Sequence, residues 1–251
     1  MEAIRSFYEH PSTTLRAGEA LARVQAGAVA DALEAAGPAR PLVVDVGCGD
    51  GMIAGVVQAA CAARHEVRHG PAHAGAGPVV LGTDWSTAAV GAARANGLRV
   101  VQATPDGPGL PLADATADVV LMSEVVEHLV DTDGALDECR RILRPGGTLV
   151  VSTPNLAAWY NRVLLLFGVQ PVFSEVSLRG IYGRPGTEVV GHLRLFTKRA
   201  LVGLLEARGF VDITVGAAPY HDVPRGFRAL DRLLCRVPSL GSLLVARCRR
   251  P

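Results

Sequence analysis

The chain has 251 residues, of which 49% are hydrophobic and 20% are charged, so we expect one soluble globular domain (1–251) with a sizeable core. Its 25 basic and 24 acidic residues leave a net charge of +1, which provides no overall field to attract nucleic acid or a membrane surface. The longest apolar runs fall well short of the roughly 20 residues that a bilayer-spanning helix needs.

The cysteines and the first residues favour a cytoplasmic protein. The five cysteines are odd in number and form no CxxC pair, which argues against a disulfide framework or a zinc ribbon. The N-terminus has no apolar core of about 7 to 15 residues behind a basic start, so we expect no secretory signal. These features leave the oligomeric state open.

Short β-branched runs alternate with longer segments of helical period. This alternation predicts an α/β fold in which parallel strands are joined by helices, and strands that are apolar on both faces predict helices on each side of the sheet. An N-terminal helical cap is expected over 1–40. The expected strands are 42–46, 79–83, 98–102, 118–122, 148–152, 211–215 and 242–246.

Two helices have clear ends in the sequence, and two segments depart from the alternation. One helix is expected over 133–143, before RPGG, and another between Thr197 as N-cap and Gly209 as terminator. Residues 61–78 are too long and glycine-rich for a minimal link between helix and strand. The longer insertion, 155–192, is the expected substrate cap.

The strongest motif is DVGCGDG at 45–51, directly after the first strand. Glycines here let a ligand approach the backbone at the carboxyl end of a parallel sheet. Met52 stands where a dinucleotide fingerprint requires glycine. Asp45 would repel a pyrophosphate but suits a ligand with a cationic end.

The second strand ends in GTDWS, which places Asp84 and Trp85 at its tip. A carboxylate there can accept both hydroxyls of a ribose, and Trp85 offers a flat apolar face for an adenine ring. A ribose, an adenine and a cationic amino-acid end together describe S-adenosylmethionine.

Four motifs, DVGCGDG, GTDWS, LPLADATADVVLMSEVVEHL and LRPGGTLVVSTPN, follow one another within about 42–155, and a further similarity covers 192–210. In this order they resemble class I S-adenosylmethionine-dependent methyltransferases, most of all the quinone-biosynthesis O-methyltransferase subgroup. The resemblance implies a Rossmann-like, seven-stranded, mostly parallel sheet of order 3-2-1-4-5-7-6 with an antiparallel last strand.

The resemblance also implies a cofactor site. Asp45 would bind the methionine amino group, and Asp84 and Trp85 would bind ribose and adenine. Many relatives bind the exocyclic amine of adenine through an acid just after the third strand. Ala103 and Thr104 occupy that position here, so backbone groups or the shifted Asp106 would bind the adenine. The remaining implied cofactor contacts are Gly47, Cys48, Gly49 and Ser123.

A second group of polar residues lies in SEVVEHL. On a helical turn Glu124, Glu127 and His128 would share one face, and His192 could add a fourth ligand for a divalent ion such as Mg²⁺. This resembles the metal site of quinone-biosynthesis and small-RNA 2′-O-methyltransferases. We prefer a metal-free mechanism with His128 or His192 as general base, because His192 is placed by resemblance alone.

The expected cap and the two ends of the chain contain further candidates. The residues expected to bind the acceptor are Trp159, Tyr160, Arg162 and Tyr182, with Asn161, Phe173 and Arg184 beside them. His65, His69 and His73 are expected to be solvated loop residues, because Gly70 and Pro71 interrupt any helix that carries all three. The segment after His221 contains seven arginines and two aspartates. This local excess of positive charge could attract an anion, or it could simply be a solvated surface.

These features predict a methyltransferase that uses S-adenosylmethionine to methylate a hydroxyl, or less readily an amine, of a small molecule such as a specialised metabolite, sugar or quinone-like compound. Neither nucleic acid nor a membrane is expected as a partner. The alternatives are a metal-assisted RNA 2′-O-methyltransferase, which would need a basic aromatic groove, and a cofactor-binding scaffold without catalysis.

Overall fold

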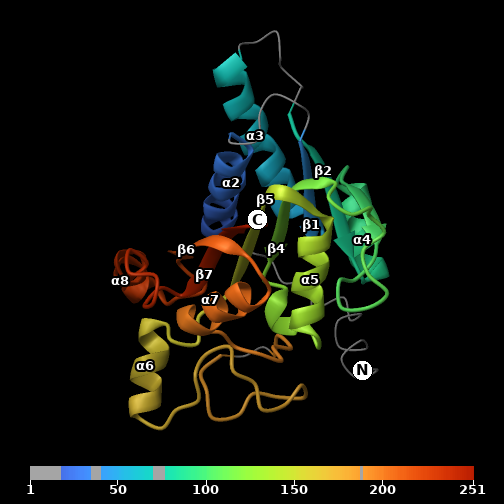
Figure 1. The fold of residues 1–251 in the computed structure, drawn as a ribbon. Coiled ribbons are helices and arrows are strands. Elements are labelled where there is room, and N and C mark those ends of the chain that lie inside the picture. The colour runs from blue at the N-terminus through green and yellow to red at the C-terminus, as the bar shows by residue number, and fades with distance from the viewer. Residues whose placement is uncertain (1–17, 35–40, 70–76, 187–188) are drawn as a thin grey trace.

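The computed structural model describes residues 18–34, 41–69, 77–186 and 189–251. They contain a seven-stranded sheet of order β3-β2-β1-β4-β5-β7-β6, in which β7 runs antiparallel to both of its neighbours (Figure 1). This confirms the predicted fold. The strands are β1 (Leu42–Val46), β2 (Val79–Asp84), β3 (Arg99–Gln102), β4 (Ala117–Ser123), β5 (Leu143–Pro154), β6 (Val211–Ala218) and β7 (Leu243–Arg249).

Helices cover both faces of the sheet (Figure 1). On one face, α2 (Glu19–Glu34) and α3 (Met52–His69) pack on side chains such as Val43. On the other, α5 (Thr132–Ile142) and α7 (Lys198–Ala207) pack on the alternate residues, such as Val44. The other helices are α4 (Thr87–Ala95), α6 (Trp159–Leu166), α8 (Arg228–Leu234) and the 3-10 turns η3 (Val126–His128) and η4 (Arg225–Phe227).

The register of the central strands brings their carboxyl ends together. Val46 of β1 is paired with Thr83 of β2 and with Met122 of β4. The loop that follows β1, the acid at the end of β2 and the residues after β4 are therefore neighbours. This edge of the sheet is where ligands bind in open α/β folds.

Most predicted elements are confirmed to within a few residues, with one clear exception. Residues 61–69 are not part of a long link but continue α3, because CAARHEVRH contains no glycine or proline before Gly70. His65 and His69 therefore lie on a helix rather than in a loop, while His73 lies outside the described residues.

The described part of the N-terminal segment is α2, whose buried face packs against α3, β4 and β5. The remainder of the expected cap, 1–17 and 35–40, lies outside the described residues. Among the helices that the structure describes, none has the length and apolar character of a bilayer-spanning segment.

Candidate functional site

The loop after β1 turns sharply beside β2. Gly47, Gly49 and Gly51 all have positive φ, and the amides of Gly47 and Cys48 donate to the carbonyl of Thr83 at 2.7 and 3.0 Å. A Cβ on Gly47 would lie 2.3 Å from Val125 Cγ2, whereas one on Gly49 would meet nothing within 4 Å. Gly47 thus allows tight packing, and Gly49 leaves room for a ligand against the backbone.

Gly47→Ala is expected to destabilise the fold by about 2 to 5 kcal/mol, because backbone strain and the clash with Val125 act together. Gly49→Ala is the matched control, since it has the same backbone strain without the clash, and should lose only about 1 to 2 kcal/mol. Urea unfolding of both variants measures the difference. Equal losses would contradict the steric role of Gly47.

Two carboxylates lie under this loop. Asp84 accepts hydrogen bonds from the amides of Gly49 and Ser86, both at 2.9 Å. Asp45 is 1% exposed, and neither of its oxygens accepts a hydrogen bond from the residues that the structure describes. Burial, and then the charge of Asp84, raise the pKa of Asp45 to about 7. A buried carboxyl without a partner is suited to receive a cationic group.

The expected adenine end of the site is built around Asp84 and Ala103. The amide of Ala103 donates to the carbonyl of Asp84 at 2.9 Å, and the carbonyl of the half-buried Trp85 accepts from Gln102. The oxygens of Asp106 accept from the Thr104 hydroxyl at 2.6 Å and from the amide of Val130 at 3.2 Å. Asp106 is therefore engaged within its own loop.

The Cys48 side chain is buried. It lies in a buried apolar cluster with Val90, Ala93 and Val100, which joins α4 to β3. Cys48 can therefore offer a ligand its backbone more readily than its thiol.

A buried polar network closes the site beneath the end of β4. Gln25 of α2 is fully buried and donates to the hydroxyls of Ser123 and Ser152, both at 2.9 Å. The Ser152 hydroxyl donates in turn to Glu124 at 2.8 Å. Sequence analysis missed Gln25, although its position on the apolar face of α2 is the signal that could have indicated it.

Glu127, His128 and His192 form a compact group above this network. One potential ligand atom from each lies within 4.8 Å of the others, and both histidine Nε2 atoms are 4.0 Å from Glu127 Oε1. Glu124 is not in this group, because the backbone turns to a positive φ of 54° there instead of continuing a helical face. The structure thus brings together three of the four predicted ligands.

The other ring nitrogen of each histidine lies against a backbone carbonyl. His128 Nδ1 is 3.2 Å from the oxygen of Gly191, and His192 Nδ1 is 2.9 Å from the oxygen of Phe173. A proton on Nδ1 satisfies each contact and leaves the Nε2 lone pair directed toward Glu127. Both histidines are therefore arranged as neutral ligands or bases.

Burial controls the charge of this group. Burial and then the charge of Glu124 raise the pKa of Glu127 well above its usual range. Burial, followed by the neighbouring His192, lowers the pKa of His128 to about 3, and burial also lowers that of His192. Since neither oxygen of Glu127 accepts a well-formed hydrogen bond from the described residues, the group contains a buried acid facing two neutral imidazoles.

Glu175, which sequence analysis also missed, holds the segment that carries His192. Its buried carboxylate accepts from the consecutive amides of Val190, Gly191 and His192 at 2.6, 2.7 and 3.2 Å, and pairs with the buried Arg184 at 3.1 Å. Nothing in the local sequence distinguishes Glu175 from an ordinary surface acid.

The predicted acceptor-binding residues are dispersed. Trp159 donates to Asp231, Arg162 donates to the carbonyls of Ala157 and Ser239, and Tyr182 is 60% exposed. Tyr160 stacks edge-on against Trp159. Phe173, which was expected beside the acceptor, has its ring centre 5.7 Å from that of His192. Tyr220 packs against Phe173 and was not predicted from the sequence.

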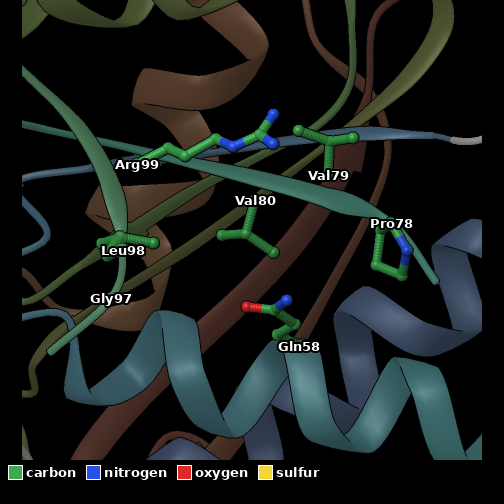
Figure 2. A pocket seen from close by; sticks show the side chains of 7 residues that line it. All are labelled: Gln58, Pro78, Val79, Val80, Gly97, Leu98 and Arg99. Atoms are coloured by element: carbon green, nitrogen blue, oxygen red, sulfur yellow. The ribbon is translucent and has the colours of Figure 1, made fainter. Parts of the chain in front are cut away.

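A separate small cavity of about 160 Å³ lies between α3 and the first residues of β2 and β3 (Figure 2). Its lining includes Gln58 from α3 and Arg99 from β3. Pockets for small organic ligands usually measure about 300 to 1,000 Å³, and this one faces the opposite end of the strands from the glycine loop. It is therefore not a candidate for a nucleoside.

A family model described as a methyltransferase domain matches residues 20–215. The chain belongs to the methyltransferase family. It is 39% identical over 113 residues to a probable S-adenosylmethionine-dependent methyltransferase of Mycolicibacterium smegmatis, an alignment that covers 45% of this chain and 38% of the relative. A ubiquinone biosynthesis O-methyltransferase of Rhizobium johnstonii is 34% identical over 125 residues, or 47% of this chain and 44% of the relative. The chain thus matches less than half the length of these curated methyltransferases.

Solved methyltransferases share the whole fold. A structure from Thermotoga maritima aligns with a TM-score of 0.56 at 18% identity and covers 92% of both chains. A geranyl diphosphate methyltransferase in complex with S-adenosylmethionine aligns with a TM-score of 0.53 at 17% identity, covering 91% of this chain and 85% of the other. At these identities the similarity concerns the Rossmann-like methyltransferase fold.

Proposed function

We propose that this methyltransferase transfers the methyl group of S-adenosylmethionine to a hydroxyl of a small molecule. The observation that supports it best is the convergence of buried Asp45 and Asp84 under an open glycine loop, at the same end of the sheet as the Glu127, His128 and His192 group. The first part suits a nucleoside with a cationic side chain, and the second suits an acceptor that must lose a proton.

The residues of the glycine loop and the strand ends would bind the donor. Asp45, once ionised, would attract the cationic amino-acid end, and the remaining lone pairs of Asp84 would accept the ribose hydroxyls. Because the sulfonium is already an activated donor, these residues need only hold its methyl group in line with the acceptor oxygen. The buried surroundings would exclude water from the space between the methyl group and the acceptor oxygen.

The three-residue group fits a divalent metal ion. Two neutral imidazoles whose Nδ1 atoms face carbonyls, and a buried carboxylate that lacks a well-formed hydrogen bond from the described residues, are the donor set that such an ion requires. Two nitrogen ligands favour Mn²⁺, Zn²⁺ or Fe²⁺ over Mg²⁺. A bound ion would lower the pKa of an acceptor hydroxyl. This geometry favours a metal-assisted transfer to the small-molecule hydroxyl over the metal-free mechanism in which His128 or His192 acts as general base.

The cap segment 155–192 would close over the acceptor. Phe173 and His192 come from this segment and lie in contact, so the cap contributes directly to the wall beside the metal-binding group. The acceptor would then lie between Phe173 and the donor methyl group.

Asp84→Ala is expected to weaken binding of S-adenosylmethionine and of its demethylated product tenfold or more, because it removes charge-assisted hydrogen bonds to ribose worth roughly 1.5 to 3 kcal/mol. Isothermal titration calorimetry measures both affinities. Asp114→Ala, which removes an exposed carboxylate paired with Arg141, is the matched control and should bind as the wild type does. Equal binding by Asp84→Ala, or tight binding of NAD by the wild type, would contradict the proposal.

A further inference from the structure

Eight apolar side chains are exposed on α6, η4, α8 and the residues that directly follow these helices. Leu166 is 83% and Phe167 79% exposed at the end of α6, and Leu233 is 53% exposed on α8. Singly exposed apolar residues are ordinary, but a group of this size marks an interaction site. Its members are Val163, Leu165, Leu166, Phe167, Phe227, Leu230, Leu233 and Val237, which we call the apolar face.

The two helices that carry this face are in direct contact. The rings of Trp159 and Phe227 are 5.8 Å apart, and Trp159 Nε1 donates to Asp231 of α8 at 3.0 Å. Arg162 of α6 also donates to the carbonyl of Ser239, just after α8. Figure 1 shows both helices at the same side of the molecule, next to the end of the sheet formed by β6 and β7.

The exposed charges within the two segments that carry the apolar face have one sign. Within 159–168 and 225–237 the exposed charged residues are all arginines, namely Arg162, Arg225, Arg228, Arg232 and Arg236. The single acid of these segments, Asp231, is 1% exposed and bonded to Trp159 and Ser242. Four of these arginines, all but Arg162, belong to the arginine excess noted in the sequence after His221.

The apolar and the cationic residues of η4 and α8 form two separate stripes. Phe227, Leu230 and Leu233 recur every three residues, and Arg228 and Arg232 are four residues apart, so each set follows its own stripe. Arg236 lies in the turn directly after α8. Asp231 faces inward between them. A helix with an apolar stripe beside a basic one is the pattern of interfacial membrane-binding helices.

We propose that α6, η4 and α8 form a docking surface for an anionic lipid bilayer. The apolar side chains would enter the boundary between headgroups and acyl chains, and the arginines would pair with lipid phosphates. A second copy of the chain fits this surface poorly, since two such faces would bring like charges together. Nucleic acid would satisfy the arginines but leave the apolar residues against phosphates. Peripheral binding of this kind needs no bilayer-spanning helix, and it departs from the expectation, based on net charge, that no membrane is a partner.

Vesicle sedimentation of the full chain tests this proposal without any methyl acceptor, so its outcome is independent of the proposed function. The wild type should partition onto vesicles of equal parts phosphatidylglycerol and phosphatidylcholine, bind vesicles of phosphatidylcholine alone at least tenfold less, and be released by salt of about 0.5 M. Arg232→Ala with Arg236→Ala should lower partitioning roughly 30-fold. Leu166→Ser with Phe167→Ser should lower it at least about tenfold.

Matched controls lie on other faces. Arg99→Ala changes an exposed arginine at the opposite edge of the sheet, and Val67→Ser changes a valine on α3 that is 89% exposed. Both should partition as the wild type does. A wild-type protein that does not partition onto anionic vesicles would overturn the proposal. So would a dimer that Leu166→Ser and Phe167→Ser abolish, or RNA binding that depends on Arg232 and Arg236, because each would assign the surface to another partner.

Discussion

Glu127→Gln is expected to lower methyl transfer at least about a hundredfold and to weaken the binding of Mn²⁺ or Zn²⁺ by at least tenfold, because the amide removes the one charged ligand of the group. The variant should fold normally, since it removes a buried carboxylate. Direct metal titration by calorimetry, together with initial rates at saturating S-adenosylmethionine, measures both effects.

Glu124→Gln is the matched control for this experiment. Glu124 is partly buried, and this burial raises its pKa to about 7, but its carboxylate accepts from Ser152 and is not among the three grouped ligand atoms. We therefore expect Glu124→Gln to retain metal binding within a few fold. Excess chelator should abolish activity in the wild type, and added Mn²⁺ or Zn²⁺ should restore it.

Three results would contradict this mechanism at different levels. Full activity in excess chelator would exclude a metal ion from the reaction and would indicate that His128 or His192 acts as the general base. Full activity in both His128→Ala and His192→Ala would exclude the whole group. Weakened metal binding with unchanged activity in Glu127→Gln would separate the site from the reaction.

The sequence predicts the fold well because its signals are local. Apolar runs of strand length, DVGCGDG after the first of them and a helix bounded by Thr197 and Gly209 each act within a few residues. The Thr197 hydroxyl accepts from the amide of Ala200 at 3.2 Å, and Gly209 has a φ of 77°, as the sequence predicts. The extension of α3 to His69 is not predicted because the glycines and prolines of 61–78 all lie from Gly70 onward, so the composition of the whole segment hides a helical first half.

The candidate site could be predicted only in part, because its geometry depends on contacts between distant segments. His192 lies near Glu127 because Glu175 binds the amide of His192 and the carbonyl of Glu127 accepts from the amides of Leu193 and Arg194. Gln25 reaches Ser152 across 127 positions of the chain. The hydrogen bonds of Trp159 to Asp231 of α8 and of Arg162 to Ser239 likewise join distant segments, which no local pattern indicates.

Asp45→Asn is expected to abolish cofactor binding while stabilising the ligand-free protein above neutral pH. Burial raises the pKa of Asp45 from 3.8 to about 7. The folded state therefore holds the proton more tightly than the unfolded state does, so the contribution of Asp45 to stability is largest below pH 4 and is lost as the pH rises through 7. Above that pH the buried charge costs roughly 4 kcal/mol, which asparagine would recover in part. Urea unfolding at pH 4 and pH 8 should show a gain only at pH 8.

The same linkage predicts how the cofactor binds. Because the cationic end of S-adenosylmethionine needs ionised Asp45, its affinity for the wild type should increase as the pH rises to about 7, and binding below that pH should release a proton. Calorimetry in two buffers of different ionisation enthalpy measures this proton. Asp114→Asn, an exposed acid, is the control and should leave both affinity and proton release unchanged. Binding of equal strength by Asp45→Asn, or no release of a proton by the wild type, would remove Asp45 from the cofactor site.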